Sequence, residues 1–375
     1  MRTVVLLLLL GAGVPAPAQP PILQTLEFLR SIGPAAAPAP TGPARVVFAI
    51  GSVGKAGRTR PGVRARLQLS GPADSVTLRV VASHTGLGTA TATVARRAAT
   101  HGVELYFQSA AAPAVGGADL TLRWEYRAPA GNWVSFATTR HRLYWVLSAP
   151  GLPWGGPREE ELWAATLAVS CRAAAGARTP EEAASAVTRF VYGSRDEASQ
   201  RTKFQYNPML PDANLTHLDA AAGQYVVRTE DLQALLASLN NPAMAHLQLN
   251  CYDAAGCVML LSNALGCRLR RVKVNSAYYL VTRKLIPMGF TKPAKADFRV
   301  HCVAWSGPLD ERGLVYDACF ALPPAPAAAP ATPLAALPFG SSQHPGSYAE
   351  RVFTNKEAFY LTPLPALVIR PAAVP

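Results

Sequence analysis

The sequence has few charged residues for its length: 16% of its 375 residues are charged, and 50% are hydrophobic. Disordered chains combine low hydrophobicity with high net charge, so this composition excludes a mostly disordered protein and predicts a buried core. There is no Gly-X-Y repeat, no sustained heptad pattern and no apolar run of about 18 residues, which excludes collagen, a coiled coil and a polytopic membrane protein. The length fits two domains better than one.

Cysteine is also scarce, with six residues in the whole chain, too few for a disulfide scaffold. All of them lie after residue 150, so any thiol chemistry is expected in that part of the chain, and the sequence leaves their disulfide connectivity open. They are Cys171, Cys251, Cys257, Cys267, Cys302 and Cys319. Lysine is rare beside arginine, which is typical of a GC-rich bacterial genome.

The first residues have the pattern of a secretion signal. Met1-Arg2 is basic, Val4–Val14 is an apolar run too short to span a bilayer, and Ala16-Pro17-Ala18 is a small-x-small cleavage pattern. We therefore expect residues 1–18 to be a cleavable signal peptide. The mature protein is then expected to be secreted or periplasmic, with no transmembrane segment.

Positive charge is concentrated in the first half. Residues 19–150 carry 14 Lys and Arg against 5 Asp and Glu, whereas residues 151–375 carry 21 against 18. The arginines alternate with apolar residues, which favours a solvated sheet face over a binding surface. Binding of an acidic envelope polymer to this basic half is the second interpretation, and no motif for a nucleic-acid partner is present.

Residues 44–150 read as a β-sandwich. Apolar and polar residues alternate with a period of two at 63–70 and 120–127, and seven or eight such runs are separated by Gly, Pro and Asn turns. Short strands without helices predict an immunoglobulin-like sandwich. The preceding residues 19–43 are rich in Pro and Ala and are predicted to be a spacer.

The periodicity becomes helical after a turn-rich hinge at 149–156. A capping box with Pro at the first helical position opens one of the helices, and a Pro/Ala-rich stretch at 322–347 is predicted to be a surface loop. The predicted helices span 157–176, 180–193 and 229–239. The fold class is therefore α+β, an N-terminal all-β sandwich followed by a C-terminal α+β domain over 157–375.

The stretch 249–267 carries the strongest chemical signal. Asn250 is a good N-cap with Asp253 three residues later, apolar residues recur at helical spacing from Ala254, and Gly266 is a C-terminal stop. Cys251 is thus predicted to be the first residue of a buried helix. The unpaired N–H groups and the positive end of the helix dipole favour the thiolate, which is the nucleophilic form of cysteine.

Two later segments offer the partners that a thiolate nucleophile needs, a base and a group that orients the base. Residues 298–305 look like a strand carrying His301, and residues 313–320 look like the next strand, carrying Asp317. The short turn between them favours an antiparallel hairpin. We therefore expect His301 and Asp317 to be cross-strand neighbours that face the helix of Cys251.

This ordered set resembles the transglutaminase-like superfamily, whose core has a papain-like Cys-His-Asp architecture. The resemblance covers residues 245–321, roughly a fifth of the chain, and implies that Cys251 is the nucleophile, His301 the general base and acid, and Asp317 its orienting group. It rests on Asn250-Cys251-Tyr252-Asp253-Ala254, Ala264-Leu265-Gly266, His301-Cys302-Val303-Ala304-Trp305 and Val315-Tyr316-Asp317-Ala318. Two departures, Cys302 in place of a small residue and the missing Pro after Asp317, remove no catalytic atom.

The implied activity is acyl transfer on peptide or carboxamide bonds through a thioester, by an exported cysteine-dependent enzyme. A protease, amidase or deamidase is favoured slightly over a transglutaminase. Gln248 is a candidate oxyanion donor, and Trp305, Tyr278 and Tyr279 are weaker candidates for a substrate groove.

Two other interpretations of the sequence are a zinc site and a non-catalytic module. A zinc site from Cys251, Cys257, Cys302 and His301 has no familiar ligand spacing, so we expect no metal and no cofactor. The alternative from another class is a non-catalytic envelope or adhesion module with a vestigial triad.

Overall fold

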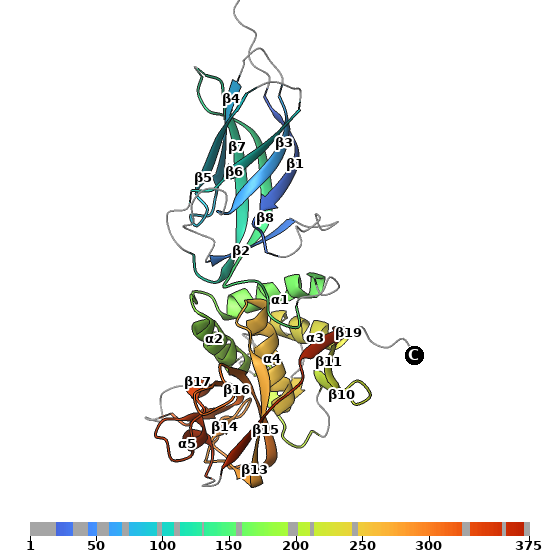
Figure 1. Cartoon of the computed structure of the whole chain (residues 1–375), viewed down its shortest axis with the longest axis vertical. Helices are drawn as coiled ribbons and strands as arrows, with labels where there is room; N and C mark the ends of the chain where they lie inside the picture. The colour runs from blue at the N-terminus through green and yellow to red at the C-terminus, as the bar shows by residue number, and fades with distance from the viewer. Residues whose placement is uncertain are drawn as a thin grey trace, which may run out of the picture. The chain divides into compact units, whose positions relative to one another are not determined.

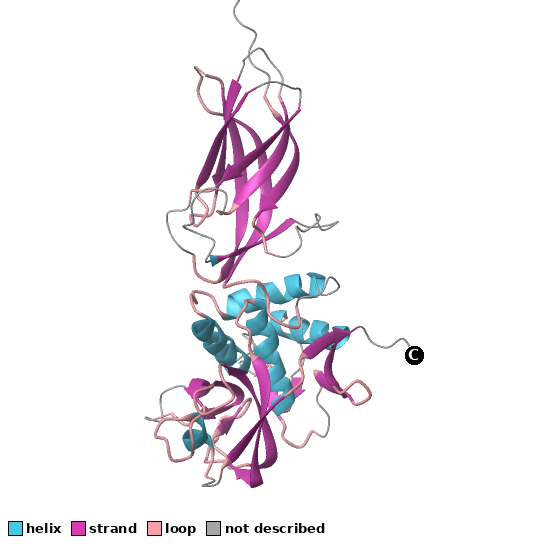
Figure 2. Cartoon of the chain, in the orientation of Figure 1, coloured by secondary structure: helices cyan, strands magenta, loops and turns pink. Residues whose placement is uncertain are grey.

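A computed structural model describes most of the chain. The described residues are 20–32, 44–50, 60–69, 75–95, 100–108, 113–129, 131–154, 160–193, 202–210, 214–241, 247–324, 331–354 and 358–370. The signal peptide expected over 1–18 lies outside them. The fold is rich in strands with few helices (Figure 2), and none of the described helices is long and apolar enough to cross a membrane.

The chain divides into two compact units, which we describe separately. The first combines the described residues up to Arg30 with Ala56–Ala110 and Leu120–Arg140. One sheet has the strand order β1–β3–β6, and a second has the order β2–β8–β7–β4–β5; by residue range, β2, the start of β7 and the end of β8 belong to the second unit. The strands are β1 (Ile22–Leu29), β2 (Ala44–Ala49), β3 (Gly62–Gln68), β4 (Ser75–Ala82), β5 (Thr89–Ala95), β6 (Thr100–Tyr106), β7 (Gly116–Arg127) and β8 (Val134–Val146). No helix occurs among the described residues of this unit.

The strands of the first unit follow the predicted alternation. In β3, Val63 and Leu67 are buried, and Arg64 between them is exposed and bonds to Glu27 and Glu104 on the neighbouring strands. The alternation therefore reflects a half-buried sheet with solvated arginines.

The spacer predicted over 19–43 needs correction, because β1 lies within it and pairs antiparallel with β3. A register shift between Leu23 and Thr25 interrupts the alternation of this strand. Such a bulge places two residues opposite one, so a pattern of period two does not reveal the strand.

The second unit holds Ser31–Lys55, Ala111–Asp119 and His141–Pro375. Its main sheet has the order β14–β16–β15–β13–β18, with β17 also paired to β16 (Figure 1). The bounds are β13 (Arg270–Val281), β14 (Ile286–Pro287), β15 (Asp297–Ser306), β16 (Leu314–Leu322), β17 (Thr332–Pro338) and β18 (Phe359–Pro363). The strand β17 lies in the stretch predicted to be a loop. Its backbone pairs with β16, and the Pro/Ala-rich composition of the stretch does not indicate this pairing.

Helices and two small sheets complete this unit. The helices are α1 (Glu160–Ala173), α2 (Pro180–Gly193), α3 (Thr229–Asn240), α4 (Cys251–Ala264) and α5 (Tyr348–Val352). One small sheet contains β10 (Thr216–Asp219), β11 (Gln224–Arg228) and β19 (Leu367–Arg370), and the other contains β9 (Phe204–Tyr206) and β12 (Leu247–Leu249). The predicted helices are present, with ends that differ by a few residues at most.

Helix α4 is the core element of the second unit and packs on β15 and β16. Every residue from Asp253 to Ala264 is buried. Gly256 allows close packing, since a Cβ there would lie 2.7 Å from Cγ2 of Thr216. The helix ends before Gly266, whose φ of +92° is in the left-handed region that favours glycine.

Candidate functional site

The first turn of α4 fixes the position of Cys251. The side chain of Asn250 accepts hydrogen bonds from the backbone N–H groups of Tyr252 and Asp253 at 3.0 and 3.1 Å, and the Asp253 side chain accepts one from the backbone N–H of Asn250, so the predicted N-cap is part of a capping box. Asp253 in turn accepts backbone bonds from Leu215 and Thr216 at 2.9 and 3.0 Å. The start of the helix is thereby tied to β10, and Cys251 is held at the helix N-terminus with 8% of its surface exposed.

His301 and Asp317 form a buried pair on the β15–β16 hairpin. Nε2 of His301 lies 2.9 Å from Oδ2 of Asp317, and the two residues are 0% and 1% exposed. The same oxygen accepts a 2.8 Å bond from the Tyr348 hydroxyl, while Oδ1 accepts one from the backbone N–H of Cys319. Both carboxylate oxygens are therefore occupied, so Asp317 is fixed in orientation and in turn fixes the imidazole.

The electrostatics of the site favour a charged histidine. Burial opposes the imidazolium, but Asp317 and Cys251 outweigh it and raise the pKa of His301 to about 10. Nε2 is engaged by Asp317, whereas Nδ1 makes no hydrogen bond within the described part of the chain. Phe298 and Phe320 pack against the imidazole with ring centroids 5.6 and 5.4 Å away. Nδ1 is consequently the ring nitrogen that Asp317 leaves available.

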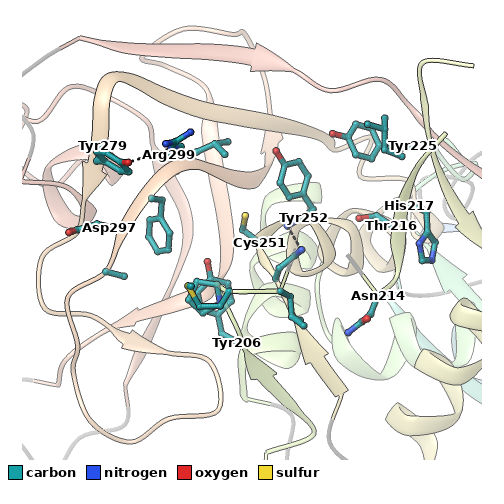
Figure 3. A pocket seen from close by; sticks show the side chains of 18 of the residues that line it. Tyr206, Asn214, Thr216, His217, Tyr225, Cys251, Tyr252, Tyr279, Asp297 and Arg299 are labelled. Atoms are coloured by element: carbon teal, nitrogen blue, oxygen red, sulfur yellow. Dashed lines mark hydrogen bonds between the residues drawn. The ribbon is translucent and has the colours of Figure 1, made fainter. Parts of the chain in front are cut away.

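Cys251 opens into a groove of about 1300 Å³. Figure 3 shows its sulfur between Tyr206 and Tyr252, with Tyr279 and Arg299 towards one end of the groove and Tyr225 and His217 towards the other. Met209, Leu218 and Tyr279 are exposed on its walls. The groove offers a bound chain both aromatic faces and apolar contacts on either side of the thiol.

Three of the weaker sequence candidates lie elsewhere. Trp305 is fully buried against Phe339 and donates its indole N–H to the Pro308 carbonyl, so its assignment to the groove was wrong. Gln248 does not line the groove, and its side-chain oxygen accepts a bond from Asn207. Tyr278 is exposed outside the lining, which leaves Tyr279 as the candidate that does line the groove. The alternating pattern identified aromatic residues on strands but did not show which face of the sheet borders the groove.

Two tyrosines of the site were missed. Tyr206 on β9 is 3% exposed and lines the groove, and burial, reinforced by Cys251, holds its pKa well above the usual range. It is therefore a neutral phenol that can donate a hydrogen bond near the sulfur. Tyr348 is fully buried and donates to Asp317. No local motif marks either residue, because they are respectively 45 positions before Cys251 and 31 after Asp317.

The remaining cysteines define no zinc centre of the kind weighed from the sequence. All six cysteines fall within the described residues, and each is free and buried. Among those residues the one group with metal-ligand spacing is His301, Asp317 and Cys319. Burial and the neighbouring Asp317 hold the pKa of Cys319 well above its usual range. A protonated thiol and a carboxylate that already accepts three hydrogen bonds fit a metal poorly.

No family model and no curated protein matches the chain. Among solved structures, the chain is similar to red sea bream transglutaminase, with a TM-score of 0.42 and 12% sequence identity. The match covers 79% of this chain and 52% of that one. The chain thus spans about half the length of that protein.

Proposed function

We propose that the protein is a cysteine-dependent acyl-transfer enzyme that acts on peptide or carboxamide bonds. The observation that carries this proposal is the buried His301–Asp317 pair, with Nδ1 of His301 unengaged by any described residue and Cys251 at a helix N-terminus in a groove. Burying such a pair has a desolvation cost, and perturbed titratable groups in a groove are typical of active sites. The order Cys251, His301, Asp317 is also the one that the family resemblance implies.

In the proposed reaction, Sγ of Cys251 attacks the substrate carbonyl carbon and the C–N bond breaks. Nδ1 of His301 holds the thiol proton and delivers it to the leaving nitrogen, so an amine or ammonia departs and a thioester remains. Water or a second amine then attacks the thioester and gives a proton to His301. The thiolate is the leaving group, which restores the starting state.

We assign the developing oxyanion two donors in this reaction. The backbone N–H of Cys251 is at the helix start, where it has no intrahelical partner. The Tyr206 hydroxyl is the second donor, because its burial keeps it protonated and it lines the groove beside the sulfur (Figure 3). Tyr206 takes the place that the sequence suggested for Gln248.

We favour hydrolysis over crosslinking, hence a protease, amidase or deamidase over a transglutaminase. The groove is large and exposed residues such as Met209 and Tyr279 form its walls, so water has access to a thioester on Cys251. Transfer to an amine needs walls that exclude water. Export through the predicted signal peptide and a protein or peptide substrate belong to the same proposal.

The test is the rate of iodoacetamide alkylation at Cys251 against pH, read by peptide mass spectrometry. We expect the wild type to reach its rate plateau below about pH 7, and Cys251 in the His301→Ala variant to behave as an ordinary thiol whose profile has its midpoint at about pH 8.5. Cys267 in the same digest is an internal control, since burial raises its pKa to about 12. A wild-type profile like that of an ordinary thiol would favour the alternative, a non-catalytic module.

A further inference from the structure

Arg271 on β13 is a buried cation that the proposed reaction does not use. It is 1% exposed, and none of its three side-chain nitrogens forms a hydrogen bond with any part of the chain that the structure describes. Burial lowers its pKa, but a guanidinium stays charged in proteins. An unpaired buried charge is expensive, so its presence calls for a functional explanation.

The guanidinium lies beneath one end of the groove. Its central carbon is 4.5 Å from the ring centroid of Tyr225, a cation–π distance. Tyr225 stacks on Tyr252 with centroids 5.9 Å apart, and both rings line the groove (Figure 3). Tyr252 directly follows Cys251, so the two stacked rings link Arg271 to the residue next to the nucleophile.

The strand fixes this position. Arg271 pairs with Ala304 on β15, and the adjacent Val272 pairs with Pro363 on β18, so β13 is held from both sides. The carboxylate of Asp253 acts on Arg271 electrostatically but forms no ion pair with it within the described residues, because its oxygens accept backbone bonds at the start of α4. Among the described residues, the positive charge therefore has no fixed counterion.

We propose that Arg271 is a positioning residue whose positive charge, acting through Tyr225 and Tyr252, stabilises the thiolate of Cys251. This inference rests on the proposed function. In a low-dielectric site a charge acts over several ångströms, and negative charge arises at the sulfur in the free enzyme and again when the thioester is cleaved. The arrangement lowers the cost of the thiolate without placing a cation where substrate must bind.

Other titratable groups also face these two residues and contribute to any pH profile. Those near Arg271 are Tyr225, Tyr252, Asp253 and Cys302, and those near Cys251 are Tyr206, Tyr225, Tyr252, His301, Cys302 and Cys319. Burial raises the pKa of the two tyrosines and of Cys302, so these groups are neutral near pH 7. Arg271 and His301 remain as the cations whose removal should shift the profile of Cys251.

The experiment replaces Arg271 with Met, which fills similar volume without charge, and measures the pH profile of Cys251 alkylation in the full chain. We expect the midpoint to rise by about one pH unit, while Arg271→Lys retains most of the wild-type behaviour. The matched control is Arg270→Met, which removes a charge from the neighbouring residue, whose side chain bonds to the Gly307 carbonyl. This control should leave the midpoint unchanged.

Thermal unfolding of the same variants separates an electrostatic role from a structural one. Replacing a buried charge by an apolar side chain is often neutral or stabilising, so a shifted profile in a stable Arg271→Met variant supports the proposal. An unshifted midpoint overturns it, and does so without affecting the proposed function as long as His301→Ala still differs from the wild type. If the Met variant does not fold, Arg271→Gln gives the same comparison.

Discussion

The two units differ in where they place their charged groups. In the first, Arg64 bridges Glu27 and Glu104 with half of its side chain exposed, and the more exposed Arg79 and Arg123 both reach the buried Glu125. In the second, His301 and Asp317 are paired at 2.9 Å with almost no exposure. Exposed pairs are screened by water and salt, whereas a buried pair controls protonation. The difference shows that the number of arginines in a region does not indicate where buried, mutually perturbed titratable groups are found.

Breaking one pair in each unit should show the largest contrast. Asp317→Asn keeps the shape of the side chain but removes the charge beside His301. We expect a loss of about 3 kcal/mol in the free energy of unfolding, and the alkylation rate of Cys251 should no longer reach a plateau below about pH 7. Arg64→Ala breaks a solvated pair and should leave the urea midpoint unchanged within error. Equilibrium urea unfolding of both variants checks this. Equal effects of the two substitutions would contradict the distinction.

The pH dependence of stability should separate His301 from another buried histidine of the second unit, His141. The pKa of His301 is raised from 6.5 to about 10, so its stabilising contribution is complete below pH 6.5 and is lost as the pH rises to about 10. Burial lowers the pKa of His141 to about 4, so stability is lost instead as the pH falls below about 6.5. Urea unfolding from pH 4 to 10 should show the alkaline loss weaken in His301→Gln and the acid loss weaken in His141→Gln. An alkaline loss unchanged in His301→Gln would refute the raised pKa.

A smaller effect is expected from glycine substitutions in the two units. A Cβ at Gly256 would lie 2.7 Å from Thr216, whereas one at Gly102 in β6 meets nothing within 4 Å. We expect Gly256→Ala to destabilise by about 1 kcal/mol, because overpacking outweighs the helix propensity gained, and Gly102→Ala to be close to neutral. Thermal unfolding measures both. Stabilisation by Gly256→Ala would show that Thr216 moves aside easily.

Much of the site was predictable because its signals are local. The cap at Asn250 and Asp253 involves residues three positions apart, and the hairpin joining His301 to Asp317 has a short turn, so both follow from neighbouring residues. The helix start at Cys251 is found as predicted. The signal peptide and the immunoglobulin-like topology stay predictions, while the spacer over 19–43 and the loop over 322–347 were wrong where β1 and β17 lie.

The sequence by itself determined the helices α1 to α4 of the second unit, the helix start at Cys251 and the hairpin that brings His301 to Asp317, because capping and short turns act between residues close in the chain. Only the tertiary structure decided that Tyr206 and Tyr348 lie in the site, that Trp305 lies outside it, and that Arg271 contacts Tyr225 with no hydrogen-bond partner for its side chain among the described residues. The positions of these side chains depend on which strands pair and which faces of the sheet are covered. Contacts between residues distant in the sequence fix both, and no local pattern records them.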